Sequence, residues 1–269
     1  LPMTVYSYTA GPLPLLMSIP HLGEEIPADI ASRLLPSALG SDDTDWYLDR
    51  LYSFATDLGF SILQAKKSRY VIDLNRDPSG TSLYPGADTT ELCPTSSFSR
   101  QPLYAEGNAP GDAEIAARVA TYWRPYHDEI SQRLAAMRAE HGVALLFDCH
   151  SIRSRVPRFF AGRLPDFNLG TGGGSACAPE LETRLAQALR QDPRYETAVN
   201  GRFKGGYITR HYGQPAHRIH AFQLELSMAT YSDENLPRPT YDAAKAAQLR
   251  PSLQGLLQTA KDWILSQSR

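Results

Sequence analysis

The stretch Ala144-Leu145-Leu146-Phe147-Asp148-Cys149-His150-Ser151 decides the fold. A short apolar run that follows a glycine and ends in a histidine predicts a buried strand with His150 at its carboxyl end. In open α/β sheets, ligands and metals are held at the carboxyl ends of the strands. The stretch therefore predicts an α/β sheet with His150 in a site at its edge.

Three further apolar runs lead to, or contain, polar residues that could belong to the same site as His150. They are Leu13 to Ile19 before His21, Val71 to Leu74 before Asn75 and Arg76, and Ala221 to Leu226, which contains Glu225. If these strand ends converge, they bring together two imidazoles, carboxylates and an arginine. That combination of side chains is typical of a hydrolytic zinc site.

Composition bounds the class of protein. The chain has 269 residues with 42% hydrophobic content, so we expect one α/β domain over 1–269. A net charge of -2 and a pI near 6.4 give no reason to propose a nucleic acid or an anionic membrane as partner. Three widely spaced cysteines without a C-x-x-C pair favour a reducing cytosol, and no run approaches the roughly 20 apolar residues of a membrane span. We therefore expect a cytoplasmic protein that acts on a small molecule, with its oligomeric state left open.

Between the site-bearing runs, helices alternate with short strands. The patterns predict a helix over 41–59, strands at 61–65 and 70–74, a long helix over 112–141 that Pro125 kinks or divides, and a helical tail over 241–266. The region 77–111 is rich in Pro, Gly, Ser and Thr. Loops of that length usually cover or line a site, so we expect this one to do so. A further loop at 205–213 presents Arg210.

The third ligand of the predicted zinc site should be a carboxylate, because catalytic zinc prefers nitrogen and carboxylate ligands and keeps one position for water. Glu24 stands at H-x-x-E spacing after His21, so that one turn could offer both groups to a single ion. Asp45, at the start of the predicted helix, is the rival candidate. Ordinary helix capping is the alternative role for Asp45.

Glu225 alternates with apolar neighbours along its strand and is a candidate general base, the alternative being a solvent-facing position on a half-exposed strand. Arg76 and Asn75 close a predicted strand, where a guanidinium can grip a carboxylate with two hydrogen bonds. Arg69, Arg153 and Arg210 are further candidates for an anion-binding role.

Six motifs in order resemble the N-formylglutamate amidohydrolase family. They are Ser18-Ile19-Pro20-His21-Leu22-Gly23, Asp43-Thr44-Asp45-Trp46, the segment 68–78, Asp148-Cys149-His150-Ser151-Ile152, the segment 205–213 and Gln223-Leu224-Glu225-Leu226. The match covers residues 14–234. The resemblance implies one domain with a mixed, mostly parallel sheet between helices, like the phosphorylase/hydrolase-like fold of zinc carboxypeptidases and aspartoacylase.

The resemblance also implies roles for individual residues. One zinc ion per chain would be held by His21, His150 and a carboxylate, with Asn75 and Arg76 at the substrate carboxylate and Glu225 as the base. The family pattern commonly has Thr or Arg at the position of Glu24 and an acidic residue at that of Asp45. We keep both carboxylates as candidate ligands, with Asp45 ahead.

The implied reaction is hydrolysis of N-formyl-L-glutamate to formate and L-glutamate, at the end of histidine degradation. Zinc would lower the pKa of its water to about 7, Glu225 would guide that water, and Arg69 or Arg76 would stabilise the oxyanion. Arg76, Arg153 and Arg210 are the candidate anchors for the two substrate carboxylates. The alternatives are a zinc deacylase for another N-acyl amino acid, like aspartoacylase, and a non-catalytic amino-acid-binding protein whose structural zinc has four protein ligands.

Overall fold

The computed structural model describes residues 4–235 and 238–268. The strands are β1 (Tyr6–Thr9), β2 (Leu15–Ile19), β3 (Ser61–Ala65), β4 (Ala144–Ile152), β5 (Phe167–Gly170), β6 (Thr197–Val199), β7 (Ile219–Ser227), β8 (Ser232–Asp233) and β9 (Thr240–Tyr241). The α-helices are α1 (Ala28–Ala31), α2 (Leu48–Leu51), α3 (Asp112–Arg118), α4 (Arg124–His141), α5 (Pro179–Leu189), α6 (Tyr207–Tyr212) and α7 (Ala243–Gln267).

Within the described residues, seven strands form one sheet in the order β1-β3-β2-β4-β7-β5-β6. Its central pairs β3/β2, β2/β4 and β4/β7 are parallel, as is β5/β6, whereas β1/β3 and β7/β5 are antiparallel. This topology confirms the predicted α/β class with a mixed, mostly parallel sheet.

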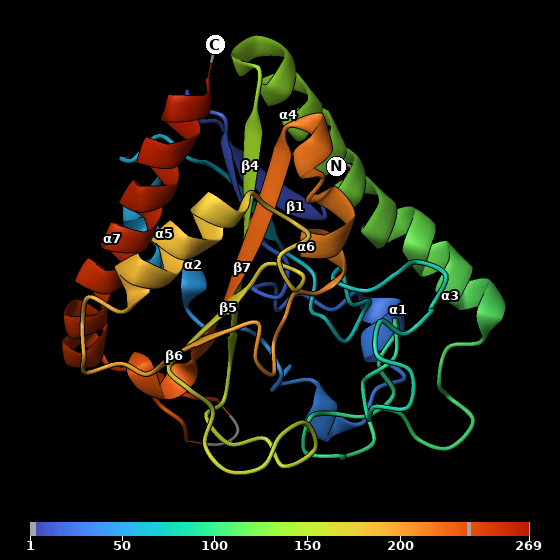
Figure 1. The fold of residues 1–269 in the computed structure, drawn as a ribbon. Coiled ribbons are helices and arrows are strands. Elements are labelled where there is room, and N and C mark those ends of the chain that lie inside the picture. Colours follow the sequence, from blue (N-terminus) through green and yellow to red (C-terminus); the bar gives the residue numbers. More distant parts are fainter. Residues whose placement is uncertain (1–3, 236–237, 269) are drawn as a thin grey trace.

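Helices cover both faces of the sheet (Figure 1). On one face α5 and α7 pack against alternate strand residues such as Leu15, Met17 and Phe147. On the other, α4 and α6 cover the intervening residues, including Leu16 and Leu146. Strands buried on both faces read as continuous apolar runs, which is why the sequence pattern revealed them.

The register of the central strands positions the site. In the parallel pair β4/β7, His150 lies opposite Glu225 and Asp148 lies opposite Gln223. Ser18 of β2 lies opposite Asp148, and the chain leaves β2 at Ile19, two residues before His21. Side chains on one face of a strand repeat every two residues, so these paired polar groups share a face of the sheet. They lie near the carboxyl ends of the parallel strands.

The helix predicted over 41–59 is wrong in extent. Only α2 and a 3-10 turn at Ser53–Ala55 form there, and Tyr47, which precedes α2, has a positive φ of 65°. The backbone N–H of Asp45 donates to the His21 carbonyl at 2.9 Å instead of entering a helix. The acidic cluster at 42–45 therefore belongs to the site rather than to a helix start.

The strand predicted at 70–74 is also wrong. The segment is buried but has no strand pairing, because its amides bond to nearby turns and to the long loop, such as Val71 N to the Ser68 carbonyl at 2.9 Å and Asp73 N to the Leu92 carbonyl at 2.7 Å. The apolar run indicated correctly that the segment is buried, but it did not mean that the segment forms a strand. The loop predicted at 205–213 contains the helix α6, and the sequence patterns did not identify β1 and β5.

The long helical segment over 112–141 forms as predicted, with a division near Pro125. A π-helical stretch at Val119–Trp123 separates α3 from α4. Proline removes an N–H donor from the helix, which accounts for the irregular turn just before it. Over the described part of the chain, every helix is too short or too polar to cross a membrane.

Candidate active site

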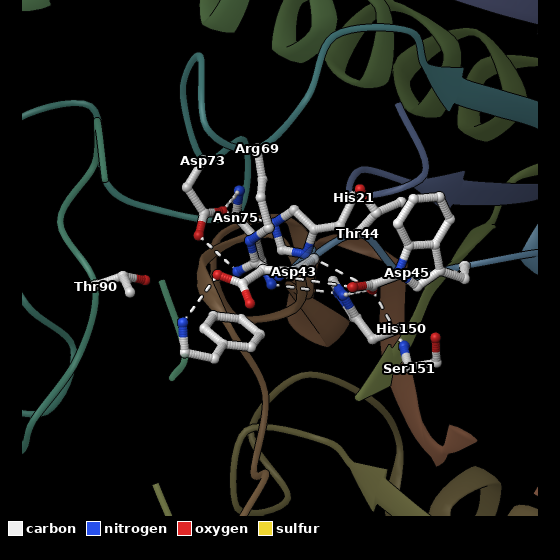
Figure 2. A network of polar contacts seen from close by, with 12 residues as sticks. His21, Asp43, Thr44, Asp45, Arg69, Asp73, Asn75, Thr90, His150 and Ser151 are labelled. Carbon is white, nitrogen blue, oxygen red and sulfur yellow. Dashed lines mark hydrogen bonds and ion pairs between the residues drawn. The ribbon is translucent and has the colours of Figure 1, made fainter. Parts of the chain in front are cut away.

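His21, Asp45 and His150 form a compact buried group. One ligand atom from each residue lies within 4.8 Å of the others. Figure 2 shows the two imidazoles directed toward the Asp45 carboxylate, with Asp73 and Arg69 beside His21. Asp45 Oδ2 also accepts a hydrogen bond from the Ser151 backbone N–H at 3.1 Å, so the carboxylate does not serve as a helix cap.

Each imidazole is backed by a second carboxylate. His21 Nε2 lies 2.6 Å from Asp73 Oδ1, and His150 Nε2 lies 2.5 Å from Asp148 Oδ2. The other nitrogen of each ring faces Asp45 Oδ2, with His150 Nδ1 at 3.3 Å and His21 Nδ1 at 3.7 Å. A carboxylate on the far nitrogen is the usual support for a histidine that ligates a metal. The group therefore fits a divalent cation such as zinc.

The electrostatic setting keeps Asp45 ionised. Burial would raise its pKa, but hydrogen bonds and charge interactions with His150 and His21 outweigh burial and lower the pKa to about 2. Burial likewise opposes ionisation of Asp73, and the charges of His21 and Arg69 hold its pKa well below the usual range. Metal ligands must be deprotonated, and the Asp45 carboxylate meets this condition at neutral pH.

Glu24 lies apart from this group. Its side chain is about half exposed and pairs with Arg238, with Arg238 Nη1 3.2 Å from Glu24 Oε2. It also borders a different surface hollow, beside Trp46 and Asp49. The structure thus brings Asp45, and not Glu24, to His21 and His150.

Glu225 lies beside His150 on the neighbouring strand and lines the same cavity, which has a volume of about 470 Å³. The residue is only 8% exposed, so it is not on a solvent-facing strand. Burial raises its pKa to about 8, against the opposing charge of His150. Within residues 4–235 and 238–268, its carboxylate has no hydrogen-bond partner. The group is placed and tuned to accept a proton near neutral pH.

Arg69, Asn75 and Arg76 line the cavity next to the two histidines. Arg69 Nη2 donates to Asp73 Oδ2 at 3.0 Å and its guanidinium lies over the Phe98 ring. Asn75 Nδ2 lies 3.3 Å from His150 Nε2, and its Oδ1 accepts from the Ile208 N–H.

The Arg76 guanidinium is only partly engaged. Its Nη2 donates to Thr90 Oγ1 at 3.2 Å, and its buried Nε lies 3.6 Å from Asp73 Oδ2 without a hydrogen bond. Donor capacity remains for an anion in the cavity.

The other two predicted arginines lie outside the cavity lining. Arg210 donates from Nε to the Gly205 carbonyl at 2.8 Å and from Nη2 to Tyr84 Oη at 3.0 Å. Arg153 Nη1 donates to the Glu234 carbonyl at 3.3 Å. The structure does not bring either side chain to the histidines, although Arg210 supports the cavity wall through Tyr84.

The long loop 77–111 lines the cavity as predicted, through residues such as Tyr84, Asp88 and Phe98. Several lining residues were missed by sequence reasoning, namely Asp73, Phe98, Arg158 and Gln223. Asp73 stands within the quoted motif over 68–78 and could have been found there, whereas Arg158 follows no strand end or motif. The cavity combines three residues that fit a cation, a carboxylate beside them and arginine side chains held in the wall. This combination suits hydrolysis of a small anionic amide.

Comparisons with known proteins agree with this chemistry. The family model described as N-formylglutamate amidohydrolase matches residues 13–232. A protein from Pseudomonas aeruginosa named N-formylglutamate deformylase is 48% identical over 259 residues, which cover 96% of this chain and 97% of the relative. A protein of the same name from Pseudomonas putida is 46% identical and covers 96% of each chain.

Solved structures show the same fold. The crystal structure of N-formylglutamate amidohydrolase from Ralstonia eutropha JMP134 has a TM-score of 0.82 and 25% identity, covering 97% of this chain and 99% of that one. A gene product of Agrobacterium tumefaciens has a TM-score of 0.68 at 16% identity, with coverage of 97% and 96%, and supports the fold alone. The family model and the two relatives span nearly the whole domain, and so the chain belongs to the N-formylglutamate amidohydrolase family.

Proposed function

We propose that this protein is a zinc-dependent hydrolase that converts N-formyl-L-glutamate to formate and L-glutamate. The observation that supports this most is the buried His21–Asp45–His150 group with Glu225 beside it in register and guanidiniums in the same cavity. The name shared by the two Pseudomonas relatives supports the choice of substrate. This activity would place the protein at the last step of histidine degradation.

His21, Asp45 and His150 are the proposed ligands of one zinc ion per chain. Three protein ligands are the number found in catalytic zinc sites, whereas structural sites are closed by four. A bound zinc would lower the pKa of a water to about 7 and would polarise the formyl oxygen. Asp73 and Asp148 orient the two imidazoles by holding the ring nitrogens that face away from Asp45.

Glu225 is the proposed general base and acid. It would take a proton from the attacking water as the water oxygen bonds to the formyl carbon. It would then deliver a proton to the amide nitrogen as the C–N bond breaks, releasing formate and the free amine of L-glutamate. A carboxylate whose pKa is about 8 can serve in both directions at neutral pH.

Arg69, Asn75 and Arg76 are proposed to act on the anionic parts of the reaction. Arg69 is fixed by Asp73 and by stacking on Phe98, so it is suited to stabilising charge that develops on the formyl oxygen. Asn75 and Arg76 would bind the α-carboxylate that adjoins the amide. Arg76→Ala should therefore raise KM more than it lowers kcat, while an oxyanion role predicts that Arg69→Ala mainly lowers kcat.

The direct test is release of formate from N-formyl-L-glutamate by the purified protein, before and after removal of metal with a chelator and after addition of zinc. We expect activity that disappears with the chelator and returns with one zinc per chain. A well-folded, zinc-loaded protein that releases no formate would reject the proposal. N-acetyl amino acids would then be the next substrates to assay.

A further inference from the structure

The proposed substrate carries two carboxylates, but the groups beside the histidines account for only one of them. We propose that Arg158 binds the side-chain carboxylate of the substrate and makes the enzyme selective for acidic N-formyl amino acids. This assignment rests on the proposed function, because it concerns the same cavity. It replaces Arg153 and Arg210 in that role, since neither of those residues lines the cavity.

Arg158 is placed by the same strand that carries His150. β4 ends at Ile152, and the chain then turns at 156–160, where the Phe159 and Phe160 N–H groups donate to the Val156 carbonyl at 2.9 and 3.1 Å. The turn brings Arg158 to the cavity wall. Only the short segment 153–157 separates Arg158 from the end of the strand that carries His150.

The guanidinium of Arg158 is held through two of its three nitrogens. Nε donates to Asp88 Oδ1 at 2.9 Å, and Nη1 donates to Ser96 Oγ at 2.9 Å and to the Ser97 carbonyl at 2.6 Å. The side chain is 8% exposed. In the described part of the chain, Nη2 has no hydrogen-bond partner. A fixed guanidinium with free donors can bind a carboxylate with little further loss of side-chain entropy.

The charge around Arg158 remains positive despite its acidic partner. Asp88 is shared with a second arginine, since Arg100 Nη2 lies 2.6 Å from Asp88 Oδ2. The carboxylate therefore neutralises only one of two guanidiniums, while Ser96 and Ser97 are neutral. This surplus of one positive charge favours an anion over a neutral amide of the same shape.

Apolar side chains share the cavity lining with the histidines and Arg158. Ile152, Phe98 and Phe159 line the cavity, with the two phenyl rings edge to face at a centroid distance of 4.9 Å. The two methylene groups of a glutamate side chain would pack against such a surface. The cavity thus offers a glutamate side chain both apolar surface and a cation.

Two other cations of the wall are less suited to this role. Arg202 and Lys204 also line the cavity, but both are exposed. The Arg202 guanidinium donates from Nε to the Phe159 carbonyl at 2.7 Å. An exposed cation is screened by water and must lose rotamer freedom to bind, so it discriminates less.

The test compares kcat/KM of the zinc-loaded full chain for N-formyl-L-glutamate and for its neutral isostere N-formyl-L-glutamine. We expect Arg158→Met to lower kcat/KM for the glutamate substrate about 10- to 100-fold, mainly through KM. The value for the glutamine substrate should change by less than about threefold, since it makes no ion pair. Arg158→Lys should retain part of the preference, because it keeps the positive charge but not the planar guanidinium that the loop holds in place.

Two controls separate binding from support of the loop. Asp88→Asn weakens the tie to the loop but keeps the guanidinium and removes a negative charge beside it, so the preference for the glutamate substrate should not fall. Arg155→Met removes an exposed positive charge outside the cavity and should leave the ratio unchanged. An active wild type whose substrate ratio survives Arg158→Met, or an equal fall on both substrates, would overturn the assignment alone. A wild type that releases formate from neither substrate would overturn the deformylase function and this assignment with it.

Discussion

The two ends of the cavity are built in different ways. The inner end consists of His21, Asp45, His150 and Glu225, three of which lie on or just after strands of the central sheet. The outer wall consists of Tyr84, Asp88, Phe98, Arg158 and Phe159, all of which lie on loops. Strand register positions the inner end, whereas side-chain hydrogen bonds between loops position the outer wall.

This difference separates chemistry from selectivity. At the inner end each imidazole has a buried carboxylate partner, so the geometry is rigid and a change there should alter metal binding or the chemical step. In the proposed function the outer wall would contact the rest of the substrate, so changes there should alter KM and substrate preference. Loops on a rigid scaffold can vary without disturbing the core.

The largest expected effect comes from removing the proposed base, Glu225, at the inner end. Glu225→Gln keeps the size of the side chain but cannot take a proton, so kcat should fall by about 10²- to 10⁴-fold. Zinc content and thermal stability should be retained, as measured by metal analysis and melting. Glu196→Gln, which changes an exposed glutamate just before the edge strand β6, is the matched control. If Glu225→Gln lost zinc as well, the residue would be a ligand or a structural support instead of a base.

The next effect tests the carboxylates behind the histidines. Asp73→Asn and Asp148→Asn should each weaken zinc affinity about 10- to 100-fold, because each loses the charge that orients an imidazole. Titration of the metal-free protein with zinc against a competing chelator would measure this. Asp43→Asn is the control, since Asp43 instead accepts from the Phe98 N–H of the outer wall at 2.9 Å. Equal losses in all three variants would remove the distinction between the two ends.

The third prediction concerns His127, a buried histidine that contacts the segment leading to Asn75 and Arg76. His127 Nε2 lies 2.7 Å from the Leu74 carbonyl, next to Asn75 and Arg76. Burial lowers the pKa of His127 to about 3, from about 6.5 in the unfolded chain. Between these values the unfolded state binds the proton more readily, so this contribution to stability is complete above pH 6.5 and declines as the pH falls.

This difference in pKa should lower the free energy of unfolding by about 2 kcal/mol between pH 7 and pH 5. Urea unfolding at several pH values would measure it. His127→Gln can still donate to Leu74 but does not titrate, so its stability should depend less steeply on pH over this range. An identical slope in the variant would show that other groups cause the acid sensitivity.

The same difference between strands and loops decides how much could be predicted from the sequence. His150 and Glu225 were identified because each belongs to an apolar run that forms a buried strand, and parallel register then places them side by side. The segment 70–74 was assigned to a strand in error, because burial without pairing leaves the same apolar pattern. Asn75 and Arg76 nevertheless reached the cavity, held by the loop and α4 instead of by a sheet.

The outer wall had no comparable signal. Arg158 reaches the cavity because of a turn after β4 and three hydrogen bonds to a loop about 60 to 70 residues away, none of which has a periodic pattern. Asp45 and Glu24 could not be separated by spacing alone. The choice between them depends on the path of the chain after His21, which sends Glu24 to the surface beside Arg238.

The smallest effect should come from a single hydroxyl of the outer wall. Tyr84 Oη receives a hydrogen bond from Arg210 Nη2 at 3.0 Å, while the Arg210 guanidinium also lies over the Tyr84 ring. Tyr84→Phe keeps the ring contact and loses only the hydroxyl, which at a partly exposed position contributes about 0.5 to 1.5 kcal/mol. We expect KM for N-formyl-L-glutamate to rise about two- to tenfold while kcat and zinc affinity stay unchanged. Steady-state kinetics would measure both parameters, and a fall in kcat with constant KM would mean that this part of the loop acts on the inner end after all.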